Sequence, residues 1–111
     1  MRAGDLDKFI TIKRATTTTN AFNEKVQTWS DLVTRRHAMA QPVSDAERFR
    51  AGETLATRKY RFTIRYSANV ADVDPRDRIE FEGRIYDING VKEVGRREGI
   101  EFTATARAEA P

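Results

Sequence analysis

The chain has 111 residues, of which 39% are hydrophobic and 33% charged, and its 20 Lys and Arg against 17 Asp and Glu give a formal net charge of +3. Such a chain suits one folded domain with a radius of gyration of roughly 13 Å and is not typical of a disordered protein. The small positive excess does not by itself indicate a nucleic-acid-binding protein.

Several classes of protein are disfavoured at once. The chain has no cysteine, which excludes disulfides, thiolate nucleophiles and cysteine metal sites and suits a reducing cytoplasm. No apolar run approaches the ~20 residues of a membrane helix. The start, MRAGDLDKF, has acids where a secretory signal would have its apolar core, so we expect no export signal.

The first half of the chain predicts three strands. Residues 5–14, DLDKFITIKR, place Leu6, Ile10 and Ile12 on one face. Residues 16–25, TTTTNAFNEK, predict a turn-rich connection in which Asn23 can adopt the left-handed backbone conformation. A second strand follows in KVQTWSDL, residues 25–32, and a third in TRRHAMAQPV, residues 34–43.

The next segment, SDAERFRAGE at residues 44–53, is the one candidate helix. Ser44 and Glu47 have the spacing of a capping box, and Gly52 supplies a stop. A helix of about two turns is marginal without tertiary packing. The segment is therefore either a short docked helix or a loop whose form depends on a partner.

The second half predicts further strands and turns. In RKYRFTIRY, residues 58–66, Tyr60, Phe62, Ile64 and Tyr66 alternate with basic residues and Thr63. DPRD, residues 74–77, predicts a turn. RIEF and RIYDI predict a hairpin across Glu82-Gly83, Asn89-Gly90 is the strongest short turn signal, and GRREG precedes a last strand, IEFTATA. Six or seven short antiparallel strands predict an all-β small barrel or tight sandwich.

Charge is unevenly distributed along the chain. The charged residues between positions 48 and 66 are all basic apart from Glu53, whereas residues 72–101 are rich in Asp and Glu. This separation suits either head-to-tail association of copies or two ordinary solvated faces. No large apolar patch is expected, and contacts between opposed surface charges are weak and screened by salt, so we expect the chain alone to be mostly monomeric.

Catalytic and metal-binding patterns are weak. His37 is the only histidine and has no evident Ser or Cys partner. Asp72, Asp74 and Asp77 lack EF-hand spacing, and a turn explains them better. Glu80 and Glu82 on one strand do not resemble the carboxylate pair of a glycosidase, which faces across a cleft. We therefore predict no enzyme activity, no metal and no cofactor.

The order of the segments resembles a known family. MRAGDLDKFITIKR, AFNEKVQTWSDL, HAMAQPVSDAE, YRFTIRY and DRIEFEGRIYDINGV follow one another as in the head–tail joining, or head-closure, proteins of long-tailed bacteriophages. The resemblance covers residues 2 to 107. It implies a small β-barrel with a long inserted loop, and copies that form a ring, usually of twelve, beneath the portal and adaptor rings. Phage, prophage and gene-transfer-agent particles all carry such proteins.

The resemblance also implies roles for two groups of residues. The inserted loop, about Ser44 to Thr57, corresponds to a stopper that points into the DNA channel. Its candidate residues are Ser44, Asp45, Glu47, Arg48, Phe49, Arg50, Gly52 and Glu53. The candidate basic face toward DNA or a neighbouring subunit comprises Arg58, Lys59, Arg61 and Arg65.

The implied partners are other copies of the chain, the adaptor or portal ring above, a tail terminator or tail tube protein below, and packaged double-stranded DNA held without sequence specificity. No membrane is implied. The protein would be made in the bacterial cytoplasm and reside at the head–tail junction of the particle.

Two other functions remain open. The first is a small β-barrel that binds nucleic acid, which would need exposed aromatic side chains as stacking platforms. Tyr60, Phe62 and Tyr66 are expected on the core side, which counts against it. The second is a tail-side ring protein such as a tail terminator.

Overall fold

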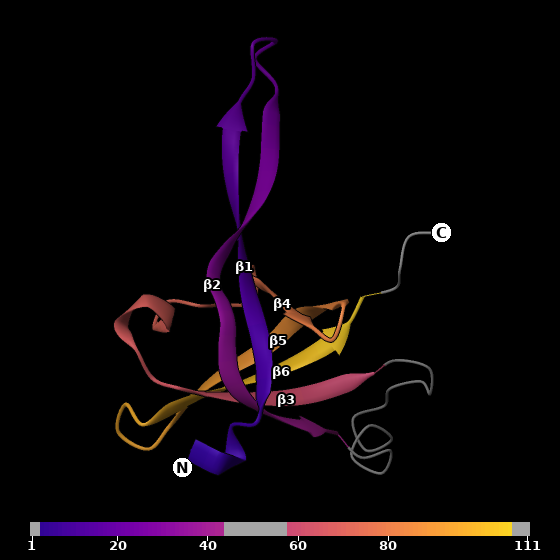
Figure 1. The fold of residues 1–111 in the computed structure, drawn as a ribbon. Helices are drawn as coiled ribbons and strands as arrows, with labels where there is room; N and C mark the ends of the chain where they lie inside the picture. Colours follow the sequence, from indigo (N-terminus) through magenta and orange to yellow (C-terminus); the bar gives the residue numbers. More distant parts are fainter. Residues whose placement is uncertain (1–2, 44–57, 108–111) are drawn as a thin grey trace.

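The computed structural model describes residues 3–43 and 58–107, which form one closed antiparallel β-barrel (Figure 1). The strand order is β1-β2-β3-β6-β5-β4, and β4 pairs back to β1. The predicted all-β fold is confirmed, and of the two predicted alternatives, a small barrel or a tight sandwich, the six strands form the barrel. The elements are η1 Ala3–Asp5, β1 Lys8–Thr19, β2 Lys25–Pro42, β3 Lys59–Arg65, η2 Ala68–Val70, β4 Arg78–Phe81, β5 Arg84–Val94 and β6 Gly99–Ala106.

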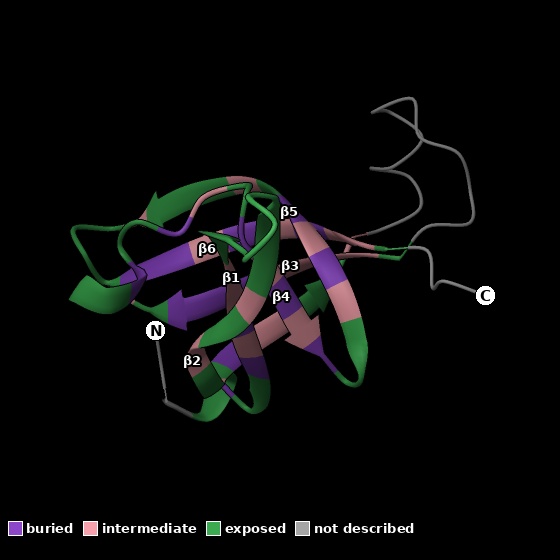
Figure 2. Ribbon diagram, turned by 90° about the horizontal axis from the view of Figure 1, so that it is seen from above, coloured by how far each residue is buried: buried purple, intermediate pink, exposed green. Residues whose placement is uncertain are grey.

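Alternating apolar residues fill the barrel. Leu6, Ile10 and Ile12 are buried as predicted, with at most 4% of each exposed. Aromatic rings form the centre of the core, where Phe62 lies 5.1 Å from Phe81 and 5.5 Å from Tyr86 between ring centroids. Edge-to-face geometry of this kind adds to the stabilisation from burial alone. Purple, buried residues accordingly mark the barrel strands in Figure 2.

Two of the predicted turns are confirmed. β4 and β5 pair across Glu82-Gly83, whose φ angles of 50° and 77° are both left-handed, as a tight two-residue turn requires. Asn23 has a φ of 63° and closes the turn between β1 and β2. The side-chain oxygen of Asn20 accepts hydrogen bonds from the backbone N–H groups of Phe22 and Glu24 in that turn.

The predicted second and third strands are a single strand, β2, so that prediction was wrong. Residues 25–42 continue along β1 through two irregularities, because Ile10, Ile12 and Lys13 pair with Arg36, Val33 and Asp31. Each step gives β2 one residue more than β1, which is the arrangement of a β-bulge. Arg35 has a φ of 51° there, and its N–H donates to Thr11 Oγ1. The bulges lie at the junction that the sequence predicted as a break.

Asn89-Gly90 was also misassigned as a turn. Both residues lie inside β5, where a further register shift occurs between Ile88 and Gly90 opposite β6. Thr105 Oγ1 donates a hydrogen bond to the side-chain oxygen of Asn89. The pair therefore forms a bulge rather than a reversal, and the actual turn follows at Gly95, whose φ is 63°.

The β1–β2 hairpin continues far beyond the barrel, as the tall ribbon in Figure 1 shows. β1 pairs with β4 only over Thr11–Lys13, whereas it pairs with β2 as far as Thr19. We call residues 14–30 the arm. It helps to explain why the radius of gyration is 15.3 Å, above the roughly 13 Å expected for a compact chain of this length.

The candidate stopper segment, residues 44–57, lies outside the described residues, and so does the candidate helix within it. The ends of the described chain on either side are adjacent. Pro42 pairs with Tyr60, and the Val43 N–H donates to the Lys59 carbonyl oxygen at 2.9 Å. None of the described helices is long and apolar enough to cross a membrane.

Candidate interaction surfaces

The arm differs in composition from the rest of the chain. Residues 15–19, ATTTT, and residues 26–30, VQTWS, carry no charge, although 33% of the whole chain is charged. All but Ala15 and Trp29 are exposed. At the tip, Phe22 is 83% exposed. The arm is thus a ribbon whose two strands are uncharged between Arg14 at its base and Glu24-Lys25 beside its tip, and it ends in an exposed aromatic ring.

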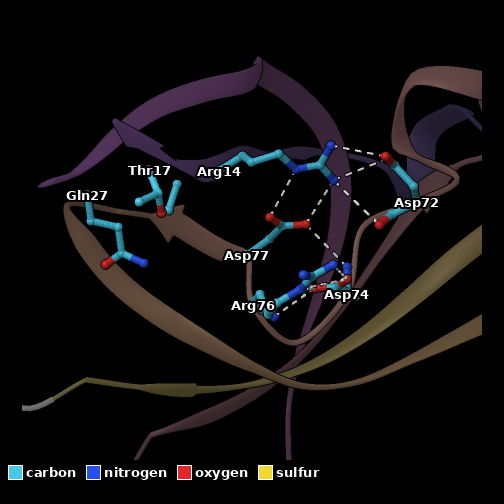
Figure 3. A pocket seen from close by; sticks show the side chains of 8 residues that line it. Arg14, Thr17, Gln27, Asp72, Asp74, Arg76 and Asp77 are labelled. Atoms are coloured by element: carbon cyan, nitrogen blue, oxygen red, sulfur yellow. Dashed lines mark hydrogen bonds and ion pairs between the residues drawn. The ribbon is translucent and has the colours of Figure 1, made fainter. Parts of the chain in front are cut away.

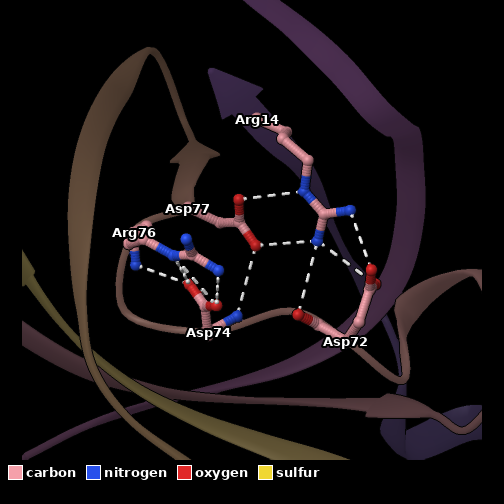
Figure 4. Close-up of polar contacts among 5 residues, drawn as sticks. All are labelled: Arg14, Asp72, Asp74, Arg76 and Asp77. Carbon is pink, nitrogen blue, oxygen red and sulfur yellow. Dashed lines mark hydrogen bonds and ion pairs between the residues drawn. The ribbon is translucent and has the colours of Figure 1, made fainter. Parts of the chain in front are cut away.

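Arg14 fixes the base of the arm to the connection between β3 and β4 (Figures 3 and 4). Its guanidinium donates to both carboxylate oxygens of Asp77, at 3.1 and 3.0 Å, and to the carboxylate of Asp72 at 3.1 and 3.2 Å. Bidentate pairing of this kind is strong and directional. The Asp77 side chain is only 5% exposed, whereas that of Asp72 is 71% exposed.

The charged side chains around Arg14 shift one another's pKa values. The hydrogen bonds that Arg14 donates to Asp77, and to a lesser extent those to Asp72, raise the pKa of Arg14 above its ordinary value. Arg14 in turn lowers the pKa of Asp72, and Arg76 lowers that of Asp74. The three aspartates therefore act as partners of arginine. Among the described residues, no group of His, Cys, Asp or Glu is placed to hold a metal ion.

A second set of contacts joins the base of the arm, on both β1 and β2, to β4. Lys13 Nζ lies 3.0 Å from Asp31 and 3.2 Å from Glu80, and both hydrogen bonds raise the pKa of Lys13. The guanidinium carbon of Arg78 lies 3.9 Å from the centre of the Trp29 ring. Glu80 is thus in an ion pair with Lys13, while Glu82 is exposed in a turn. The base of the arm is anchored on both strands.

A hollow of about 530 Å³ lies beside this base. Figure 3 shows Thr17 and Gln27 of the arm on one side and the Arg14 cluster on the other. Its lining is mostly polar side chains that already pair with each other, as Figure 4 shows for Arg14, Asp72 and Asp77. The hollow therefore lacks the apolar wall with a few convergent polar groups that small-molecule sites usually have.

The four candidate basic-face residues are not equally accessible. Arg58 and Arg65, at the two ends of β3, are exposed, whereas Lys59 and Arg61 between them are half-buried and make contacts. Thr63, which alternates with them, is only 5% exposed. Arg65 also lies near Arg36, which donates to the Arg65 carbonyl oxygen at 3.2 Å.

The aromatic residues of β3 lie on the core side, as predicted. Phe62 is fully buried, and Tyr60 and Tyr66 are partly buried against the core. None of these three rings is free to act as a stacking platform for bases. His37 is exposed and its ring lies 4.6 Å from that of Phe9, so it packs as a surface side chain.

The arm was not expected from the sequence. The Thr-rich run was assigned to the turn-rich connection around Asn23, although the turn itself is only the tip. The uncharged run of β-branched residues, matched by VQTWS, was the signal that could have revealed two paired strands.

Comparison with known families identifies the protein class. The model of the phage head completion protein family matches residues 1–107. The chain belongs to that family. This is a family of structural virion proteins rather than enzymes, so the chain is a structural component of a phage or phage-like particle.

Solved structures share the fold. A solution structure of protein SF1141 from Shigella flexneri 2a is 28% identical, with a TM-score of 0.78 over 99% of this chain and 100% of that one. A chain in the virion of a native gene transfer agent particle has a TM-score of 0.66 at 22% identity, covering 94% of this chain and 96% of that one. No curated protein matches the chain.

Proposed function

We propose that copies of this protein form a ring, of the usual twelve, at the head–tail joint of a phage or phage-like particle. The ring closes the DNA channel below the portal and adaptor and gives the tail its docking face. The observation that carries the proposal is the family match over residues 1–107. A closed barrel suits the role, because it is a rigid unit whose paired strands leave loops and the arm to make contacts.

The segment at residues 44–57 is the proposed stopper. The barrel supports this, since Pro42 and Tyr60, which flank the segment, pair directly, so that the segment is inserted between adjacent points of the barrel. Arg48 and Arg50 would hold packaged DNA by its phosphates without reading sequence. Arg58 is exposed next to the same end and would extend this basic surface.

The test uses particles from cells that lack the gene. Without the protein, filled heads should lose DNA and fail to acquire tails, and the wild-type gene should restore both. A chain in which residues 44–57 are replaced by a short Gly-Ser turn should still join heads to tails but release DNA before the tail attaches. If heads without the protein keep their DNA and join tails normally, the proposed function is wrong.

A second test concerns the basic residues. Reversal of the exposed pair, Arg58→Glu with Arg65→Glu, should reduce DNA retention with little change in the stability of the barrel. Arg84→Glu with Lys92→Glu changes the same charge at exposed positions elsewhere and serves as the control. Equal DNA retention by the two double variants would remove the DNA-facing role of Arg58 and Arg65.

A further inference from the structure

The arm has two open sheet edges. Residues 14–19 of β1 pair only with β2, and residues 25–31 of β2 pair only with β1, among the described strands. Each edge therefore presents a row of unpaired backbone N–H and C=O groups to its surroundings. A two-stranded ribbon is also only marginally stable in water by itself. Such a ribbon gains from any strand that pairs with it.

The middle of each arm strand, residues 15–19 and 26–30, lacks the features that normally protect an edge. Charged side chains, proline and bulges discourage edge pairing in native sheets. Two other stretches of open edge among the described strands have such features. β5 beyond Asp87 has the bulge at Asn89 and the charges of Lys92 and Glu93, and residues 32–37 of β2 have a bulge and the charges of Arg35 and Arg36. Residues 15–19 and 26–30 have none of them. The unprotected edges are thus confined to the arm.

We propose that arms of neighbouring copies pair edge to edge, with β1 of one arm against β2 of the next; this rests on the proposed ring. The two strands of an arm are antiparallel, so copies related by rotation about the ring axis bring a β1 edge against an antiparallel β2 edge. The same contact repeats around the ring and closes on itself, as a heterologous interface can.

Two observations favour the arm of a neighbouring copy, rather than its barrel, as the structure that pairs with an arm edge. The barrel is closed, so the barrel of a neighbouring copy offers an entering strand little free edge. Charged side chains on an edge strand also discourage pairing with a second strand. Residues 15–19 of β1 and 26–30 of β2 carry no charge, so neither side of the contact has this obstacle. In the ring each arm gains a ladder on both sides, which a single chain in solution does not have.

Cysteine cross-linking tests the pairing directly, because the chain has no cysteine of its own. Thr17 and Gln27 are exposed partners within one arm and lie at the same height along it. In a ring, Thr17 of one copy therefore faces Gln27 of the next. The variants Thr17→Cys and Gln27→Cys are produced together in cells that make particles, and isolated particles are treated with a short bismaleimide.

The expected product is a dimer that contains one chain of each variant. Particles that carry either variant alone should lose this product. Thr17→Cys with Lys92→Cys tests β5 as the acceptor, and a dominant link between these two would overturn arm-to-arm pairing. A dominant Thr17–Thr17 link in the Thr17→Cys particles would overturn it too, because it requires two β1 edges to face each other.

Charge provides an independent test. Thr16→Lys with Thr18→Lys adds charge to one exposed edge strand, and Thr16→Ser with Thr18→Ser changes the same positions without charge. The lysine variant, with the cysteines present, should lose the mixed dimer, whereas the serine variant should keep it. Circular dichroism of both purified chains checks that the barrel is folded.

Location of the chain separates this inference from the proposed function. Labelling with an antibody against the chain shows whether it lies at the head–tail joint. Chains at the joint without a 17–27 link would overturn the pairing of arms and leave the closure role intact. Absence of the chain from the joint would overturn both.

Discussion

The strands β1 and β2 form part of the six-stranded barrel and, beyond it, the whole of the arm, and side-chain burial differs sharply between these two regions. In β1, Ile10 and Ile12 are at most 1% exposed, whereas Thr16 to Thr19 in the same strand are exposed. The change occurs at Arg14, whose guanidinium pairs with Asp77. Alternation of large apolar residues stops at Ile12, and burial stops with it. Strand formation therefore needs only a paired partner, whereas a barrel needs an apolar face.

This difference predicts where the stability of the protein lies. Burial of apolar surface is the dominant favourable contribution to folding, and it is concentrated in the barrel. The arm contributes backbone hydrogen bonds and little burial. Substitutions in the barrel should therefore change the free energy of unfolding, whereas substitutions in the arm should change assembly.

The largest difference in the free energy of unfolding is expected between alanine substitutions of two phenylalanines. Phe62 is fully buried in the aromatic core, and Phe22 at the arm tip is 83% exposed. Phe62→Ala should lower the free energy of unfolding by about 3–5 kcal/mol, and Phe22→Ala should change it by no more than about 0.5 kcal/mol. Urea denaturation of the purified chains measures both. Similar losses for the two variants would mean that the arm packs against the barrel in solution.

The next largest difference in stability is expected between two aspartate substitutions where the arm meets the barrel. Asp77 and Asp72 both pair with Arg14, but only Asp77 is buried. Asp77→Ala should cost about 2 kcal/mol, because it leaves charged hydrogen-bonding groups without their partner. Asp72→Ala should change the stability much less than Asp77→Ala, because exposed ion pairs contribute little. The measurement is the unfolding midpoint of each variant, which should be lower for Asp77→Ala than for Asp72→Ala. The reverse order would contradict the role given to Asp77.

A smaller, stabilising effect is expected at the β4–β5 turn. Glu82 has a left-handed φ of 50°, a conformation that costs most residues roughly 1–2 kcal/mol. Asparagine tolerates it better, and Asn-Gly is the preferred pair for this type of turn. Glu82→Asn should raise the free energy of unfolding by about 0.5–1 kcal/mol. Arg84→Asn, also exposed and next to the turn, should not, and a loss of stability in Glu82→Asn would show that the Glu82 side chain makes a needed contact.

The smallest effect is a dependence on pH at the base of the arm. Arg14 holds the pKa of Asp72 below its ordinary value of 3.8. The pair therefore stabilises the folded chain above pH 4, and this contribution is lost as pH falls through the lowered pKa. The difference in unfolding midpoint between wild type and Asp72→Asn should be present at pH 7 and shrink toward pH 3. A difference that grows in acid would have the wrong sign.

The sequence predicts the barrel better than the arm, for physical reasons. Alternation in β3 and the Glu82-Gly83 hairpin are local patterns, and both were predicted correctly. Asn89-Gly90 was misassigned because pairing with β6 and the bond from Thr105 override a local turn preference. The Arg14–Asp77 pair joins residues 63 positions apart, which no local pattern indicates. Residues 44–57 remain a prediction from family resemblance.

The central claim is that this barrel forms a ring around the DNA channel at the head–tail joint. Electron cryomicroscopy of the joint in particles that carry the protein tests it most directly. Our account predicts one ring of barrels between the head and the tail, with the ends of residues 44–57 directed toward the channel. Density for the barrel in the capsid shell or at the far end of the tail, or a single copy at the joint, would contradict it.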